Sequence, residues 1–264
     1  MSVLWNKLPQ GVLGIFACAI WVLDLSWYRQ TPDALMIILL LPLAFFLARK
    51  APGPARAVSA AFIYRMTLLL GLGVVANSIV LMAFSWAGLA SALFFRATAI
   101  PRSRLWLVCM GAFPWVLIDL HQVGWLFRLS GAWVTGVFYD LIGSTVRIEG
   151  TQLLIDGLRI SVEAACGGMQ LLQVLLSGGV ALTLIQFPRG RGFWRLILML
   201  PVLAWVANTV RIIVICAWGL HYGVESAEGA FHTWGAMLVV VLMLGCYVLA
   251  SNWTQRSLAK GSSL

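Results

Sequence analysis

Long apolar runs separated by short polar segments dominate the pattern along the chain. Such runs occupy residues 11–28, 34–48, 105–120, 166–187, 196–219 and 232–250. A helix needs about 20 mostly apolar residues to cross a bilayer, so each run predicts a membrane span. Residues 66–95 are long for one span and short for two, which favours a tight helical hairpin that can begin as early as Ala57. The pattern therefore predicts about eight membrane-spanning helices.

Two segments depart from this pattern. Residues 122–143 are less apolar and carry several aromatic and basic side chains, which is typical of a helix lying at the membrane interface. In residues 145–163, the apolar Leu158, Ile160 and Val162 alternate with polar residues, which is the period of a strand. Asp156-Gly157 has the composition of a two-residue turn between strands. A small β-hairpin outside the membrane is therefore predicted, running directly into Cys166.

These elements predict an all-α polytopic membrane protein with one small β-hairpin, organised as a single integral membrane domain over residues 1–264. Its parts are the N-terminal spans with the interfacial helix (1–143), the hairpin (144–165) and a three-helix region (166–252). Composition agrees, because 61% of the residues are apolar and only 10% are charged. A soluble domain carries roughly 25% charged residues.

The net charge of +9 does not indicate a nucleic-acid-binding protein, because the basic residues form short clusters between the apolar runs. Cytoplasmic loops of membrane proteins are enriched in such residues, so the clusters predict a cytoplasmic N-terminus. The residues placed inside are Lys7, Arg49, Lys50, Arg56, Arg65, Arg96, Arg102, Arg104, Arg189, Arg191, Arg195, Arg256 and Lys260. This orientation puts the hairpin and Cys166 on the extracytoplasmic side.

Cys166 differs from the other four cysteines, which lie inside apolar runs. It follows the predicted hairpin and opens a predicted span, where the positive end of the helix dipole lowers a thiol pKa and favours the nucleophilic thiolate. Gly167 and Gly168 behind it allow a substrate backbone to approach closely. The alternative is a small apolar residue at the start of a helix.

Arg211 lies within the predicted seventh span, roughly 12 Å below its outer end at about 1.5 Å per residue. A charge at that depth is costly and marks a functional site by default. Asn208, three residues earlier, shares its helix face. The alternative is a structural ion pair, for example with Glu163.

His232 opens the last predicted span from outside, and its imidazole can act as a general base or acid near neutral pH. A lone interfacial histidine also serves as an amphipathic anchor. His121 and His221 lie near outer helix ends as well, so spacing alone leaves the choice open. Together a cysteine, an arginine and a histidine at the outer ends of consecutive spans make a workable acyl-transfer site.

The sequence resembles the exosortase/archaeosortase family, membrane proteins with about eight spans. The resemblance rests on Ala165-Cys166-Gly167-Gly168, on Asn208-Thr209-Val210-Arg211 and on His232, and covers residues 143–250. Gly167 stands where the common motif has a serine, which bears on subfamily and substrate preference rather than on the cysteine chemistry.

The resemblance implies a cysteine transpeptidase or protease of the cytoplasmic membrane of a prokaryote. Its expected substrates are exported proteins whose C-terminal signal combines a short motif, one membrane span and a basic tail. Cys166, Arg211 and His232 would be catalytic, with Glu163 and Asn208 in support. A lipid or another acceptor would receive the product, and no metal or organic cofactor is implied.

Two other functions fit parts of the pattern. A transporter or channel would use Arg211 to bind an anionic solute, but the sequence lacks evident inverted halves. A membrane scaffold would need none of the three residues for chemistry. Loss of substrate cleavage on changing Cys166 alone separates the enzyme from both.

Overall fold

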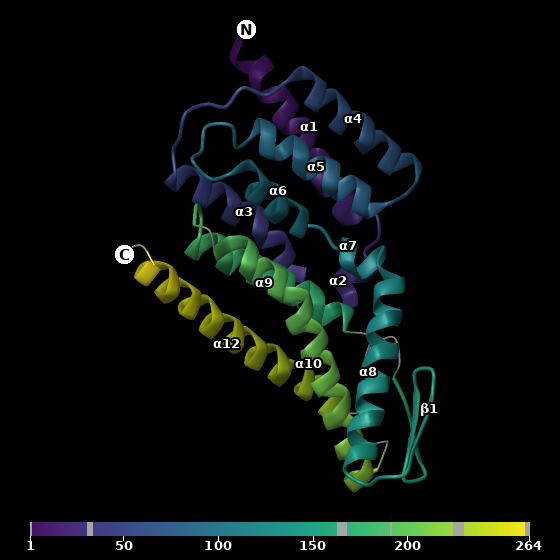
Figure 1. Cartoon of the computed structure of the whole chain (residues 1–264). Helices are drawn as coiled ribbons and strands as arrows, with labels where there is room; N and C mark the ends of the chain where they lie inside the picture. The colour runs from purple at the N-terminus through teal and green to yellow at the C-terminus, as the bar shows by residue number, and fades with distance from the viewer. Residues whose placement is uncertain (1, 31–33, 163–167, 191, 224–229, 262–264) are drawn as a thin grey trace. The chain divides into compact units, whose positions relative to one another are not determined.

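The structure of the protein, a computed structural model, describes residues 2–30, 34–162, 168–190, 192–223 and 230–261. These residues are mostly helical and include one small antiparallel sheet (Figure 1). The chain forms two compact units. The first unit, here the N-terminal unit, comprises Met1–Asp119 and Leu176–Ile197, and the second, the C-terminal unit, comprises Leu120–Leu175 and Leu198–Leu264.

Helices of very different lengths build the two units. The N-terminal unit contains α1 (Ser2–Val22), α2 (Ser26–Gln30), α3 (Ala34–Lys50), α4 (Ala60–Val75), α5 (Ile79–Leu93), α6 (Arg102–Gly111) and α7 (Trp115–Ile118). The C-terminal unit contains α8 (His121–Leu141), the strands β1 (Val146–Glu149), β2 (Gln152–Ile155) and β3 (Leu158–Ser161), and α12 (Ala230–Gly261). The helices α9 (Met169–Gln186) and α10 (Gly192–Tyr222) each contribute one end to each unit.

The helical hairpin predicted for residues 66–95 is confirmed as α4 and α5, which lie side by side (Figure 1). Its first helix begins at Ala60, where the side chain of Ser59 accepts a hydrogen bond from the backbone N–H of Phe62. Asn77 turns the chain with a φ of 49°, a left-handed conformation that asparagine tolerates better than most residues. The carboxylate of Asp119 then accepts hydrogen bonds from the Ser78 hydroxyl and the Val80 N–H, at 2.9 and 2.8 Å.

Two of the predicted single spans are wrong in detail. In residues 11–28, α1 ends at Val22, and α2 starts where Asp24 accepts a hydrogen bond from the Ser26 N–H at 2.9 Å. That hydrogen bond lowers the pKa of the Asp24 carboxyl. In residues 105–120, the helix ends at Gly111 and a short helix follows Pro114. Proline lacks an N–H group and disfavours helical geometry in the residue before it, which explains this break.

Among the described residues, two helices are long and apolar enough to cross a membrane, and they are α9 and α10. Shorter apolar helices occupy Gln10–Val22, α4 and α5. The figure of eight spans therefore stays a prediction. The predicted sixth span begins at Met169 rather than at residue 166, and α10 continues to Tyr222, three residues beyond its predicted end.

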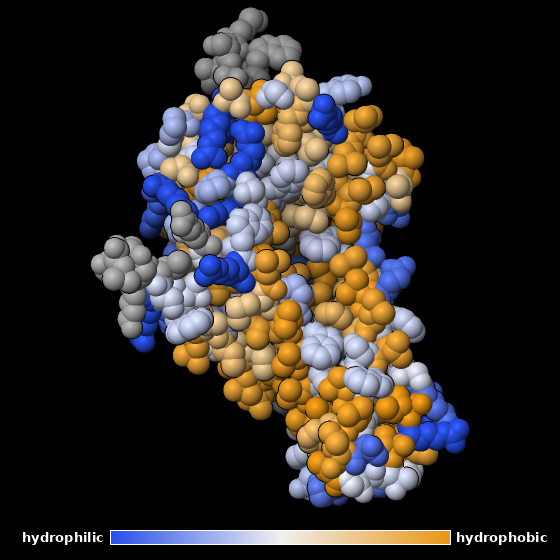
Figure 2. All heavy atoms as spheres, in the orientation of Figure 1, coloured by the Kyte–Doolittle hydropathy of each residue, from blue (hydrophilic) through white to orange (hydrophobic). Residues whose placement is uncertain are grey.

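Two basic segments of the N-terminal unit pair with each other. The backbone N–H of Ala99 donates to Ala51 at 2.8 Å, and that of Arg56 donates to Arg96 at 2.8 Å. The pairing joins the α3–α4 connection to the α5–α6 connection. Figure 2 shows hydrophilic residues gathered at this end of the unit, next to a largely hydrophobic surface.

A buried arginine ties α6 to the turn between α9 and α10 within the same unit. Arg104 is 6% exposed and donates hydrogen bonds to the carbonyl oxygens of Phe187 and Gly190, the latter at 2.8 Å. Its guanidinium also lies 4.7 Å from the centre of the Phe193 ring. The sequence predicted Arg104 to be one of a cluster of basic loop residues, and its structural role becomes visible only in the folded chain.

The predicted β-hairpin is confirmed as β2 and β3, with Ile155 opposite Leu158 and Asp156-Gly157 between them. Both turn residues have positive φ, 50° and 84°, as a two-residue turn of this type requires. The sheet holds one more strand than predicted, because Gly150, at a φ of 63°, turns β1 back onto β2. The order is β1-β2-β3, so β3 forms an outer edge.

Candidate functional site

The predicted site residues are described to different extents. Asn208 and Arg211 lie on α10 in the C-terminal unit. Cys166 and Glu163 lie outside the described residues. His232 falls in the first turn of α12, and its side chain lies outside the described part of the chain. The structure therefore describes the surroundings of Asn208 and Arg211. That Cys166, Arg211 and His232 lie together remains a prediction.

Asn208 and Arg211 are buried on one face of α10. Asn208 is 1% exposed and Arg211 is 8% exposed. Arg211 lies eleven positions before the end of the helix at Tyr222, or roughly 16 Å along the axis at about 1.5 Å per residue. It thus lies farther from this end of its helix than the sequence predicted, and a buried guanidinium in an apolar helix is costly.

Gly168 packs directly against Asn208. A Cβ atom added at Gly168 would lie 2.7 Å from Cγ of Asn208, a distance that real Cβ contacts do not show. Gly168 also has a φ of 72°, and its carbonyl accepts the N–H of Leu172 as α9 begins. Only glycine satisfies both the left-handed turn and the close contact. Gly168 thus brings the start of α9 against α10, and its role in admitting a substrate backbone stays a prediction.

The amide of Asn208 has unused hydrogen-bonding capacity. Within the part of the chain that the structure describes, neither its nitrogen nor its oxygen has a hydrogen-bond partner, although both atoms are buried. An unsatisfied buried donor or acceptor costs about 1–3 kcal/mol. Such a cost in a native structure calls for an explanation, and a ligand that pairs with the amide is one.

The helix α8 packs closely on this region through two glycines. A Cβ added at Gly124 would lie 2.9 Å from Cγ of Met169, and one added at Gly131 would lie 2.8 Å from Cδ1 of Ile212. The indole N–H of Trp205 donates to the hydroxyl of Ser130 at 2.9 Å, which fixes α8 against α10. The seven-residue spacing of the two glycines puts them on one helix face and is the signal that could have predicted this contact.

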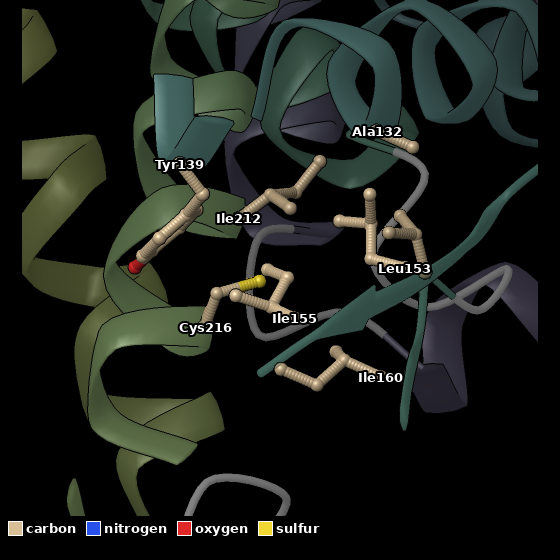
Figure 3. Close-up of a cluster of buried hydrophobic side chains, with 8 residues drawn as sticks. Ala132, Tyr139, Leu153, Ile155, Ile160, Ile212 and Cys216 are labelled. Atoms are coloured by element: carbon tan, nitrogen blue, oxygen red, sulfur yellow. The ribbon is translucent and has the colours of Figure 1, made fainter. Parts of the chain in front are cut away.

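The sheet packs its apolar face against α8 and α10. Leu153, Ile155 and Ile160 point towards Ala132, Ile212 and Cys216 in one buried cluster (Figure 3). The hydroxyl of Tyr139 on α8 donates to the backbone oxygen of Ile213 at 2.9 Å. The alternation in the sequence thus correctly predicts which face of β3 is buried. The buried face of the sheet packs on the half of α10 that carries Arg211.

The outer edge of β3 presents unpaired backbone groups. The backbone N–H of Val162 donates to the carbonyl of Thr151, on the β2 side, at 2.9 Å. Backbone groups of alternate residues point to the same side of a strand, so those of Leu158 and Ile160 also face β2. The backbone groups of Arg159 and Ser161 therefore face outward, and no described strand pairs with them. On the opposite edge, Arg147 forms an exposed ion pair with Glu149 at 2.8 Å.

Comparison with known proteins identifies one family. The sequence profile of the transmembrane exosortases matches residues 6–249, which is nearly the whole chain. No curated protein and no solved structure matches the chain.

Proposed function

The chain belongs to the transmembrane exosortase family, and on that premise we propose that it is a membrane-embedded cysteine transpeptidase. Its substrates would be exported proteins with a C-terminal signal made of a short motif, one membrane span and a basic tail. Cleavage would occur near the motif through a thioester, and an amine-bearing acceptor or water would release the product.

The observation that carries the proposal is the buried amide of Asn208. It packs against Gly168, two positions after Cys166 in the chain, and its nitrogen and oxygen have no partner among the described residues. A peptide bond offers one N–H and one C=O, the complement of a side-chain amide. A substrate backbone bound here would satisfy both groups next to the proposed nucleophile.

The proposed reaction uses three residues. His232 takes the proton of the Cys166 thiol, and the thiolate attacks the scissile carbonyl carbon. The tetrahedral intermediate collapses as the C–N bond breaks, and the imidazolium of His232 gives its proton to the leaving amine. The acceptor amine, or water, then loses a proton to His232 and attacks the thioester. Breaking the C–S bond returns the Cys166 sulfur, with the proton, to its starting state.

Arg211 would stabilise the negative charge on the tetrahedral oxygen or hold the substrate backbone. Its burial favours this role, because a fixed cation acts most strongly where water is excluded. The planar guanidinium offers several donors in a fixed geometry, as recognition of an oxyanion requires.

The edge of β3 would bind the recognition motif. An extended peptide can add as a strand to an exposed edge, with its backbone pairing there and its side chains read by neighbouring pockets. The outward-facing backbone of Arg159 and Ser161 offers such an edge. Since β3 ends five positions before Cys166, a peptide bound along it would continue towards the nucleophile.

The proposal also places Cys166 on the extracytoplasmic side of the membrane, in a protein with about eight spans. A membrane-impermeant thiol reagent added to intact cells is expected to label Cys166 more than Cys18 or Cys216. Cys18 makes the stricter comparison, because it is exposed, whereas Cys216 is fully buried. Labelling of Cys166 only after the inner face is exposed would reverse the proposed orientation.

The decisive experiment is co-expression of the protein with candidates carrying the motif, span and basic tail. Mass spectrometry is expected to find a shortened C-terminus with the wild-type chain and none with Cys166→Ala. Cys246→Ala is the matched control, since Cys246 is an exposed residue of α12 that has no part in the mechanism. Processing that survives in Cys166→Ala at equal protein level would exclude the covalent mechanism.

A further inference from the structure

A cavity of about 650 Å³ lies within the N-terminal unit. Residues of α1, α3 and α5 and of the 94–98 segment line it. Its volume falls in the range of about 300–1,000 Å³ that is typical of small-molecule sites. Aromatic rings form much of its wall, from Trp21, Phe45, Trp86, Phe94 and Phe95.

Apart from Gln10 and Arg49, the polar side-chain groups of this wall are already used within the protein. The indole N–H of Trp21 donates to Ala112 at 2.8 Å, and that of Trp86 donates to Leu13 at 2.7 Å. The hydroxyl of Thr98 donates to Ala51 at 2.8 Å. The wall therefore offers ring faces and aliphatic groups to an occupant, which favours an apolar chain over a polar solute.

The cavity adjoins a surface of the kind that contacts lipid. Gly14 lines it, and a Cβ added there would meet nothing within 4 Å. On the same helix, Val12 and Ile15 are 46% and 71% exposed, as expected for side chains that face hydrocarbon. An acyl chain can thus reach the cavity past Gly14, where α1 carries no side chain to block it.

A basic rim marks one end of the cavity. We define the rim as Arg49, which lines the cavity, with Lys50 next to it at the end of α3 and Arg56 and Arg96 on the paired segments that follow α3 and α5. The one ion pair among the described residues joins Arg147 to Glu149, so no described carboxylate neutralises Arg49. Basic pockets between membrane helices bind anionic lipid headgroups.

We propose that this cavity binds one acyl chain of an anionic phospholipid whose phosphate contacts Arg49. The aromatic wall supplies the apolar contact, and the rim supplies the charge. The site uses none of the residues proposed for catalysis, and it stands whether or not the transpeptidase mechanism is correct.

The test is a titration of the delipidated full-length protein in detergent with phosphatidylglycerol or phosphatidylcholine, with bound lipid counted by native mass spectrometry. The first phosphatidylglycerol is expected to bind more tightly than phosphatidylcholine. Arg49→Gln is expected to weaken that binding about fivefold, the contribution of one basic side chain near a membrane surface. Arg65→Gln, at an exposed arginine of α4 that does not line the cavity, is the control.

A second variant tests the cavity itself. Gly14→Leu adds an apolar side chain to the cavity wall, at a position where a Cβ meets nothing within 4 Å, and is expected to weaken binding by about tenfold or more. Gly11→Leu, on the same helix and equally open but outside the cavity wall, is expected to bind as wild type. Cys166→Ala should also bind as wild type. Equal binding of the two lipids, unchanged binding by Gly14→Leu, or displacement of the lipid by inorganic phosphate at equal concentration would each overturn the proposal.

Discussion

Two buried arginines have very different surroundings. Arg104, in the N-terminal unit, donates to the carbonyls of Phe187 and Gly190 and lies over the ring of Phe193. Arg211, in the C-terminal unit, lies one turn from Asn208, whose buried amide has no partner among the described residues. The two terminal guanidinium nitrogens of Arg104 are thus paired with backbone carbonyls, whereas the amide next to Arg211 pairs with no described group.

The difference supports the proposed distinction between a structural charge, Arg104, and a functional one, Arg211. Burial alone does not distinguish the two arginines, since the side chains of Arg104 and Arg211 are similarly buried, at 6% and 8% exposed. What distinguishes them is the neighbouring group: Arg104 donates to two backbone carbonyls, whereas Arg211 lies beside a buried amide that no described group pairs with. Polar groups paired within the chain stabilise the fold, whereas an unpaired buried amide costs stability and is open to a ligand.

The largest expected effect is on turnover at Arg211. If it contacts the reacting carbonyl, Arg211→Lys loses the planar set of donors and lowers processing by about 100- to 1,000-fold. The variant should still insert, and Cys166 should still react with a thiol reagent. Near-normal processing, measured by mass spectrometry of the substrate, would leave Arg211 as a counter-charge like any other.

The next effect is on stability at Arg104. Arg104→Met keeps the side-chain stem but leaves the carbonyls of Phe187 and Gly190 without their donor, which is expected to cost about 1–3 kcal/mol. The measurement is the temperature at which the buried thiol of Cys109, on the same helix, becomes reactive. Processing per folded molecule should be unchanged. An unaltered melting temperature, matching that of an exposed control such as Arg65→Met, would contradict the structural role.

A change at Asn208 should have the opposite effect to one at Arg104: processing should fall while stability is kept. Asn208→Leu removes an unsatisfied buried amide, so stability is expected to stay equal or rise by up to about 1 kcal/mol while processing falls about tenfold. Thr209→Val is the matched control, because the Thr209 hydroxyl does have a partner, the Trp205 carbonyl at 2.9 Å. That control should lose stability and keep its turnover. If Asn208→Leu lowers protein stability and processing together, its amide is structural.

The smallest effect is expected at the sheet edge. Arg159→Glu reverses a charge beside the proposed peptide-binding edge and should shift preference among recognition motifs by a few-fold, on the order of 1 kcal/mol or less. Arg147→Glu changes the opposite edge and should leave preference unchanged. Competition between two co-expressed substrates measures the ratio directly. A change in protein level without a change in this ratio would make β3 purely structural.

Much of the fold follows from short-range signals in the sequence. Asp156-Gly157 predicts its turn because few residue pairs adopt two positive φ values. The α4–α5 hairpin was predictable from the length of its apolar run. The break before Pro114 shows the limit, since hydropathy alone does not register a missing backbone N–H. β1 was missed because its residues, unlike those of β3, bury no regular alternating face.

The site was predictable only as a list of residue types. Asn208 and Arg211 stood out because polar residues are costly in an apolar helix. The contact between Gly168 and Asn208 joins two helices, and no local pattern encodes it. The role of Arg104 was hidden for the same reason, since its acceptors lie far along the chain and an arginine between apolar runs looks like any loop charge.

The N-terminal unit is built from two segments that are far apart in the chain, and this has a consequence for biosynthesis. Arg104 and its acceptor at Phe187 are 83 residues apart, and the ribosome delivers the first long before the second. The sheet and the residues around Cys166 are made in that interval, so this unit is completed only after much of the other has been synthesised. The nascent chain carries the guanidinium of Arg104 without its acceptors throughout. A chain truncated before α9 would remain in that condition permanently.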